Sequence, residues 1–191
     1  MPSPNATIDL IWVLWLASWV AASFWSGRTQ RRIGDVETWT YRAAMIAGGI
    51  LLVPWTERML EQKPLWDAGR AGGYAIVLVM LAGLAFVWWA RIHLGRLWSS
   101  AITRKEDHRI VDNGPYALVR HPIYTGLIVA ILATAAADAT ITALVGAALV
   151  IFGLWLKARS EERFLVTELG FDAYQSYRRR VPMLVPFTTR R

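Results

Sequence analysis

Long uncharged runs, separated by polar segments, dominate the pattern of this chain. Five can be read from the sequence: Leu10–Gly27, Ala43–Thr56, Ala71–Ala90, Pro122–Ala137 and Ala139–Leu156. Their lengths of 18, 14, 20, 16 and 18 residues approach the roughly 20 residues that a helix needs to cross a bilayer. The pattern predicts an all-α integral membrane protein with five transmembrane helices.

Four of these runs carry further information. The shortest, Ala43–Thr56, is long enough to span a membrane only if the helix includes flanking residues such as Arg42. The charged end of Arg42 can reach the headgroups. Asp138 alone separates the last two runs, which predicts a tight helical hairpin. The first run follows Asp9 rather than a basic segment, so we expect a retained helix and not a signal peptide.

Lys and Arg lie mainly on one side of this arrangement. When the segments between runs are assigned alternately to two sides, one side collects 18 of them, and the other holds only Arg58, Lys63 and Arg70. The positive-inside rule then places the N-terminus outside and the C-terminus in the cytoplasm. We expect a multi-pass integral membrane protein of the bacterial inner membrane, with its active site facing the cytoplasm. Topology thus accounts for the net charge of +7, and no nucleic-acid partner is expected.

Composition excludes several other classes of protein. Apolar and aromatic residues make up 55% of the chain and charged residues 18%, and a soluble fold of this size would struggle to bury eleven Trp. Many of these Trp lie near run ends, where they suit interfacial anchors. With no Cys and three His, the sequence predicts neither disulfides nor a metal site.

Chemistry is expected in two long polar segments on the cytoplasmic side. We interpret the chain as a single membrane domain with four parts: the first three spans (1–92), a cytosolic segment (93–121), the hairpin (122–156) and a cytosolic C-terminal segment (157–191). The 93–121 segment ends in Arg120-His121-Pro122. Since Pro suits the first turn of a helix, Arg120 and His121 should lie at the positive end of the fourth span, where an anion is favoured.

The C-terminal segment continues the fifth helix out of the membrane. Lys157 and Glu161 are four residues apart and can form an ion pair on the helix surface. Glu162 points about 100° away. Two adjacent acids just beyond a hydrophobic span can also meet a cation in a cavity shared with the Arg120 side.

Several motifs together resemble the isoprenylcysteine carboxyl methyltransferase family, to which phospholipid N-methyltransferases are related. The resemblance covers roughly residues 93–187 and includes Leu94-Gly95, Trp98-Ser99, His108, Val111, Gly114, Arg120-His121-Pro122, Tyr124, Gly126, Glu161-Glu162, Tyr174, Tyr177 and Val181-Pro182. It implies a membrane enzyme that binds S-adenosylmethionine on the cytosolic side and admits a lipophilic acceptor sideways from the bilayer, with membrane lipids as its surroundings.

By that resemblance, two segments and two single residues would line the cofactor pocket. They are His108, Arg109, Ile110, Val111, Tyr116, His121, Pro122, Ile123, Tyr124 and Glu161. These types suit the ligand, because its ammonium needs an acid, its carboxylate needs donors, and its adenine and sulfonium favour aromatic surface.

The chain departs from the family at two positions. A substrate-binding Arg of the family falls on Lys157, which keeps the charge but loses the bidentate fork. A cofactor-binding Gln falls on Ala101. The methyltransferase interpretation survives both differences, but a strict prenylcysteine substrate is less well supported.

The acceptor chemistry defines the predicted catalytic residues. A carboxylate acceptor is already a nucleophile and needs positioning only, for which Arg120 and Lys157 are candidates. An amine acceptor needs a base, for which Glu162 is the candidate. We favour a lipid-like carboxylate, because two cations and a positive helix end would repel an ammonium.

Two other classes stay open at this stage. Membrane sterol-type reductases share a similar C-terminal arrangement and use NADPH. In a non-catalytic membrane protein, the basic segments would only set topology or meet anionic lipid. The sequence does not indicate the oligomeric state.

Overall fold

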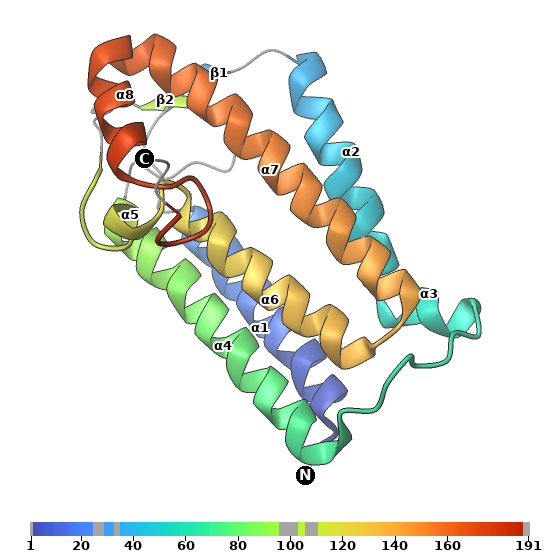
Figure 1. Cartoon of the computed structure of the whole chain (residues 1–191). Coiled ribbons are helices and arrows are strands. Elements are labelled where there is room, and N and C mark those ends of the chain that lie inside the picture. Colours follow the sequence, from blue (N-terminus) through green and yellow to red (C-terminus); the bar gives the residue numbers. More distant parts are fainter. Residues whose placement is uncertain (1, 25–28, 33–34, 96–102, 106–110, 189–191) are drawn as a thin grey trace.

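The computed structural model describes residues 2–24, 29–32, 35–95, 103–105 and 111–188 (Figure 1). The elements in these residues are α1 (Pro4–Ser23), β1 (Thr29–Arg32), α2 (Asp35–Leu51), α3 (Pro54–Met59), α4 (Gly69–Leu94), β2 (Thr103–Lys105), α5 (Pro115–Leu118), α6 (Pro122–Asp138), α7 (Ile141–Leu169) and α8 (Phe171–Arg180).

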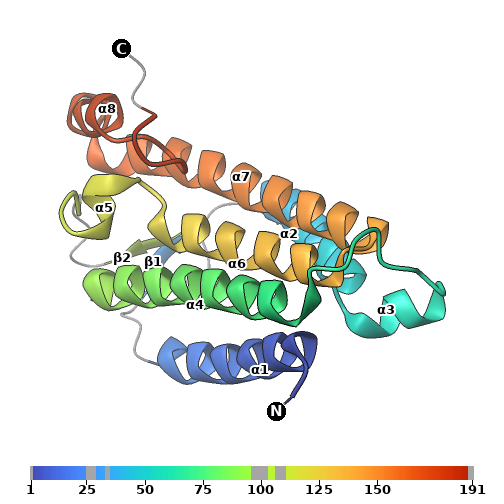
Figure 2. The same ribbon diagram turned by 60° about the horizontal axis from the view of Figure 1, so that its bottom comes forward.

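The long helices alternate in direction along the chain (Figures 1 and 2). Helices α1, α4 and α7 run toward the end of the bundle that carries α8, and α2 and α6 run back. Within the described residues, α1, α4 and α7 are long and apolar enough to cross a membrane, and α6 is a shorter apolar helix. A helical membrane protein is therefore confirmed, while five crossings and their orientation remain predictions.

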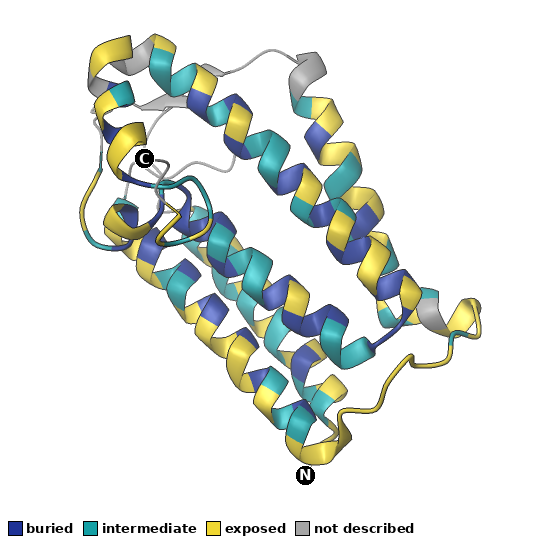
Figure 3. Ribbon diagram, in the orientation of Figure 1, coloured by how far each residue is buried: buried dark blue, intermediate teal, exposed yellow. Residues whose placement is uncertain are grey.

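Large apolar side chains lie on the outer surface of the bundle. Figure 3 shows exposed positions along the outward faces of its helices. Leu14 and Val20 on α1, Ile46 on α2 and Leu78 on α4 each expose more than half of their surface. In water such a surface would be costly, whereas lipid solvates it without penalty.

Glycine contacts hold the helices in two close pairs. A Cβ on Gly126 of α6 would lie 2.5 Å from the carbonyl oxygen of Gly83 on α4, and one on Gly48 of α2 would lie 2.5 Å from that of Gly146 on α7. Small residues allow such close backbone approach, which favours helix association in membranes. The pairs α4–α6 and α2–α7 thus pack backbone against backbone.

The turn between α6 and α7 is as tight as the sequence predicts. Only Ala139 and Thr140 separate the two helices. Ala139 adopts a left-handed conformation with φ 55°, and the Thr140 hydroxyl accepts a hydrogen bond from the backbone N–H of Ala143. Helix α7 then continues beyond Leu156, the last residue of its uncharged run, so residues 157–169 lie outside the expected membrane-spanning part.

Two details differ from the sequence-based expectation. The run Ala43–Thr56 is not one helix, because α2 ends at Leu51 and α3 begins at Pro54, which cannot continue the hydrogen-bond pattern. The fold is also not purely helical, since β1 and β2 form an antiparallel pair. These short strands depend on a partner more than 70 residues away, which local pattern does not reveal.

Candidate functional site

The residues that follow α8, 181–188, lie against the start of α6 and are called the C-terminal segment from here on. The backbone N–H groups of Arg120 and His121 donate to the carbonyl oxygens of Pro182 at 2.9 Å and Met183 at 3.1 Å. The Thr125 hydroxyl donates to the carbonyl oxygen of Leu184 at 2.6 Å. Pro122 is the first residue of α6, as predicted. These hydrogen bonds hold the C-terminal segment, which is distant in sequence, over the N-terminal end of α6.

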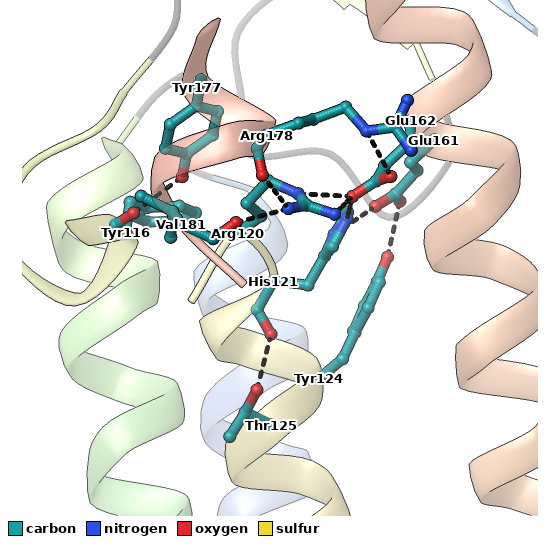
Figure 4. Close-up of polar contacts among 10 residues, drawn as sticks. All are labelled: Tyr116, Arg120, His121, Tyr124, Thr125, Glu161, Glu162, Tyr177, Arg178 and Val181. Atoms are coloured by element: carbon teal, nitrogen blue, oxygen red, sulfur yellow. Dashed lines mark hydrogen bonds and ion pairs between the residues drawn. The ribbon is translucent and has the colours of Figure 1, made fainter. Parts of the chain in front are cut away.

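Arg120 and Arg178 converge on the carboxylate of Glu162 (Figure 4). The Arg120 Nε and Nη2 atoms each lie 2.6 Å from Glu162 Oε1, and Arg178 Nε lies 3.3 Å from Oε2. Arg120 Nη1 also donates to the carbonyl oxygens of Arg178 and Val181. Arg120 therefore joins α7, α8 and the C-terminal segment.

This environment keeps Glu162 ionised. Burial alone would raise the pKa of its carboxyl, but the interactions with His121 and Arg120 outweigh burial and hold the pKa at about 2. A carboxylate with so low a pKa takes up a proton poorly near neutral pH, which makes it a weak general base.

Glu161 lies on a different face of α7 and meets another set of partners. Its Oε1 accepts a 2.5 Å hydrogen bond from the Tyr124 hydroxyl, and its Oε2 lies 3.4 Å from His121 Nδ1. Lys157 stands one turn earlier, with its ammonium 5.4 Å from the ring centre of Tyr124 and 6.0 Å from that of Tyr41. A carboxylate and aromatic rings thus surround a cation.

His121 connects the two glutamates. Its ring stacks on Tyr124 with centroids 5.4 Å apart, and its Nε2 lies 3.5 Å from Glu162 Oε1 without a well-aligned hydrogen bond. Burial alone would lower the pKa of His121, but its interactions with Glu161 and Glu162 outweigh burial and raise it. The pKa of Glu161 is lowered, because the His121 hydrogen bond and the Lys157 charge outweigh burial.

Tyr116 lies on the far side of this network, in the short helix α5. Its carbonyl oxygen accepts a 2.7 Å hydrogen bond from the Tyr177 hydroxyl of α8. His93 stacks against Tyr116 and lies 2.7 Å from Asn113 Oδ1. Gly114 has φ 56°, and a Cβ there would lie 2.7 Å from the His93 ring, so the turn before α5 needs a glycine.

The structure brings most of the predicted site residues together. His121, Tyr124, Lys157 and Glu161 form one cluster, and Arg120 contacts Glu162 beside it. Pro122 and Ile123 are buried in the first turn of α6, and Val111 is half-buried before α5. The predicted residues His108, Arg109 and Ile110, and the departure at Ala101, lie outside the described residues.

Sequence reasoning missed two contributors. Tyr41 lies on α2, in the part of the chain where no family motif was recognised, and only the packing of α2 on α7 brings its ring to Lys157. Arg178 belongs to the basic run 178–180, which suggested topology rather than a site. Among the described residues, no group of three His, Asp or Glu is placed to hold a metal ion.

Comparison with known proteins yields one family. Residues 75–167 match the model of the isoprenylcysteine carboxyl methyltransferase (ICMT) family. The matched region contains the cluster residues named above except Tyr41, Tyr177, Arg178 and the C-terminal segment.

Individual relatives carry different names. The chain is 32% identical over 124 residues to the cobalt-zinc-cadmium resistance protein CzcN of Cupriavidus metallidurans, covering 63% of this chain and 53% of that protein. It is 32% identical over 100 residues to the protein-S-isoprenylcysteine O-methyltransferase of Schizosaccharomyces pombe, covering 51% of this chain and 42% of that protein. It is 45% identical over 73 residues to methanethiol S-methyltransferase 2 of Bradyrhizobium diazoefficiens, covering 37% of this chain and 26% of that protein. The chain thus spans about half the length, or less, of these relatives.

Proposed function

Because residues 75–167 belong to the isoprenylcysteine carboxyl methyltransferase family, we propose that this chain is a membrane methyltransferase that uses S-adenosylmethionine to methylate a lipid-like carboxylate. The observation that carries the proposal is the cluster of Glu161, His121, Tyr124 and Lys157, at the end of α6 and α7 that we expect to face the cytosol. Within that cluster the acid lies beyond the uncharged part of α7, and the Tyr124 ring lies in the first turn of α6.

The residues of this cluster fit the methyl donor. Glu161 is ionised, keeps 20% of its side chain exposed, and can accept further hydrogen bonds from an ammonium group. The rings of Tyr124 and Tyr41 already stand near the Lys157 ammonium, so the site suits a cation beside aromatic surface. When bound, the donor would supply an electrophilic methyl group, while Glu161 and Tyr124 would hold its cationic part.

The state of Glu162 favours an acceptor that needs no base. Glu162 carries the pKa of about 2 described above, and both of its oxygens face arginines. A carboxylate acceptor loses no proton on methylation and requires only alignment in a dry site. An amine acceptor would need a proton removed, and Glu162 is poorly suited to that task, which weighs against phospholipid N-methylation.

In this proposal the two predicted cations have different tasks. Lys157 lies in the cluster with Glu161 and is the residue that would meet the acceptor carboxylate. Arg120 is engaged with Glu162 and with backbone carbonyls of the C-terminal segment, so it acts as a positioning residue. The reductase and non-catalytic alternatives find no support in the family match.

A thiol is the second candidate acceptor. It is favoured by the 45% identity to methanethiol S-methyltransferase 2 over 73 residues. A thiolate, like a carboxylate, attacks without a general base once it is ionised, so the same cluster could serve either nucleophile.

Methyl transfer from labelled S-adenosylmethionine tests the proposal. Detergent-purified chain is incubated with labelled donor and a lipid extract, and we expect label in the lipid fraction that mild base releases as methanol, because methyl esters hydrolyse there. Label that resists base would indicate an amine or thiol product. The variant E161Q serves as the inactive control. If the wild-type chain transfers no label and shows no calorimetric binding of the donor, the proposal is wrong.

A further inference from the structure

Residues 53–66, which contain α3 and the chain that follows it, expose large apolar side chains at the end of the bundle opposite α8 (Figure 1). The exposed fraction is 43% or more for each of Val53, Trp55, Met59, Leu60, Leu65 and Trp66. Trp55 and Met59 are four residues apart in α3 and therefore share one face of it. So many large apolar side chains on one short segment would be costly to hold in water.

The end of α2 fixes the level of this segment along the bundle. A Cβ on Gly146 of α7 would lie 3.0 Å from Leu51 Cβ and 3.1 Å from Leu52 Cγ, so α2 ends beside Gly146. Gly146 is five residues beyond Ile141, where α7 begins, which corresponds to a rise of about 7.5 Å. Helix α3 follows at once and contacts α7. It therefore lies beside the first turns of α7, where Ile141 and Val145 expose 59% and 47% of their surface.

Two hydrogen bonds fix the later part of the segment at the same level. The backbone N–H of Leu65 donates to the carbonyl oxygen of Ala139 at 2.6 Å, and the indole N–H of Trp66 donates to that of Ala136 at 3.0 Å. Ala139 belongs to the turn between α6 and α7, where both uncharged runs end. Residues 53–66 therefore lie against the boundary of the expected membrane-spanning part.

The polar residues of the segment suit the same location. Arg58 and Lys63 lie between the apolar residues and are exposed. Tryptophan rings and long basic side chains are favoured where acyl chains meet headgroups, because each has an apolar body and a polar end. The composition of the segment thus agrees with its level.

We propose that residues 53–66 lie in the membrane interface, with the apolar side chains among the acyl chains and Arg58 and Lys63 toward the headgroups. A second copy or a soluble protein could also cover apolar side chains. We assign lipid because α3 continues the exposed apolar surface of α7 at the level of Ile141 and Val145. The segment lies at the opposite end of α7 from Glu161, so this inference goes beyond the proposed function and does not depend on it.

Fluorescence quenching in vesicles tests the assignment. The chain has no Cys, so M59C carries a single NBD label when the full chain is placed in vesicles of phosphatidylcholine and phosphatidylglycerol. The apolar face of an interfacial helix lies roughly 5–10 Å into the boundary of headgroups and acyl chains. We therefore expect phosphatidylcholine with a nitroxide near the carboxyl end of its acyl chain to remove at least about half of the M59C fluorescence.

Two further labelled positions serve as controls. K63C is the matched control, because Lys63 is an exposed polar residue of the same segment, and its label should be quenched more by aqueous iodide than by the lipid nitroxide. L78C lies on α4 at a position that is 67% exposed, and its label should respond to the lipid nitroxide but not to iodide. If iodide quenches M59C as strongly as K63C, the proposal is wrong. A label at M59C that neither quencher reaches would also overturn it, in favour of a second copy or a protein partner.

Discussion

Tyr124 of α6 donates a 2.5 Å hydrogen bond to Glu161 of α7, and this bond joins the two arms of the helical hairpin at the end farthest from their turn. The bond forms between residues 37 positions apart. Near the turn the arms are held by the short Ala139–Thr140 connection, but at the opposite end their spacing depends on contacts such as this one. The proposed donor site lies directly beside it.

The first prediction concerns the charge of Glu161. We expect E161Q to lower the affinity for S-adenosylmethionine by about ten- to hundredfold, because a neutral amide loses a charge-assisted hydrogen bond of roughly 1.5–3 kcal/mol. Isothermal titration calorimetry measures this affinity. The control E61Q changes an exposed glutamate near the other end of the bundle and should bind normally. Unchanged affinity in E161Q would reduce Glu161 to a structural partner of Tyr124 and His121.

A second prediction separates buried from exposed ion pairs. E162Q leaves Arg120, whose side chain is only 8% exposed, without its carboxylate, and should destabilise the protein by roughly 3–5 kcal/mol. R180Q breaks the pair between Arg180 and Asp112, which are 64% and 47% exposed, and should cost at most about 1 kcal/mol. Thermal unfolding in detergent compares the two.

The pH dependence of the same variant gives a third prediction. The pKa of Glu162 is lowered from 4.5 to about 2, so its contribution to stability is complete above about pH 4.5 and is lost as the pH falls toward 2. The difference in Tm between wild type and E162Q should therefore be constant near neutral pH and shrink below pH 4.5. A difference that keeps its size down to pH 2 would mean that Glu162 is not held ionised.

A fourth prediction tests the glycine contact between α4 and α6. G126A places a methyl group 2.5 Å from the Gly83 carbonyl oxygen, and we expect a loss of about 1–3 kcal/mol in stability. G49A is the matched control, because a Cβ there would meet nothing within 4 Å. If both variants unfold at the same temperature, the close approach of α4 and α6 does not exist in the protein.

The fifth prediction concerns topology. The chain has no Cys, so single substitutions report cleanly. In intact cells D138C should react with an impermeant maleimide from outside, whereas R190C should react only after the membrane is opened. This pattern follows from the charge asymmetry and would place the Glu161 cluster in the cytoplasm. The reverse labelling would put the cluster on the side without S-adenosylmethionine.

The sequence by itself determined the membrane character, the tight turn after α6 and the start of that helix at Pro122. These features depend on local quantities: the length of an uncharged run, a two-residue connection and the missing N–H of proline. The resemblance of its motifs to a family also predicted that Glu161, His121 and Tyr124 belong to one site.

Only the tertiary structure decided which of these residues meet. The adjacent Glu161 and Glu162 point to different faces of α7, and the partners on each face come from distant segments. Arg120 was expected to hold a ligand, but the C-terminal segment folds back and engages it with Glu162, Arg178 and backbone carbonyls. Tyr41 reaches Lys157 because glycines let α2 approach α7. Such long-range packing is not recorded in local pattern, since it depends on the shape of the whole bundle.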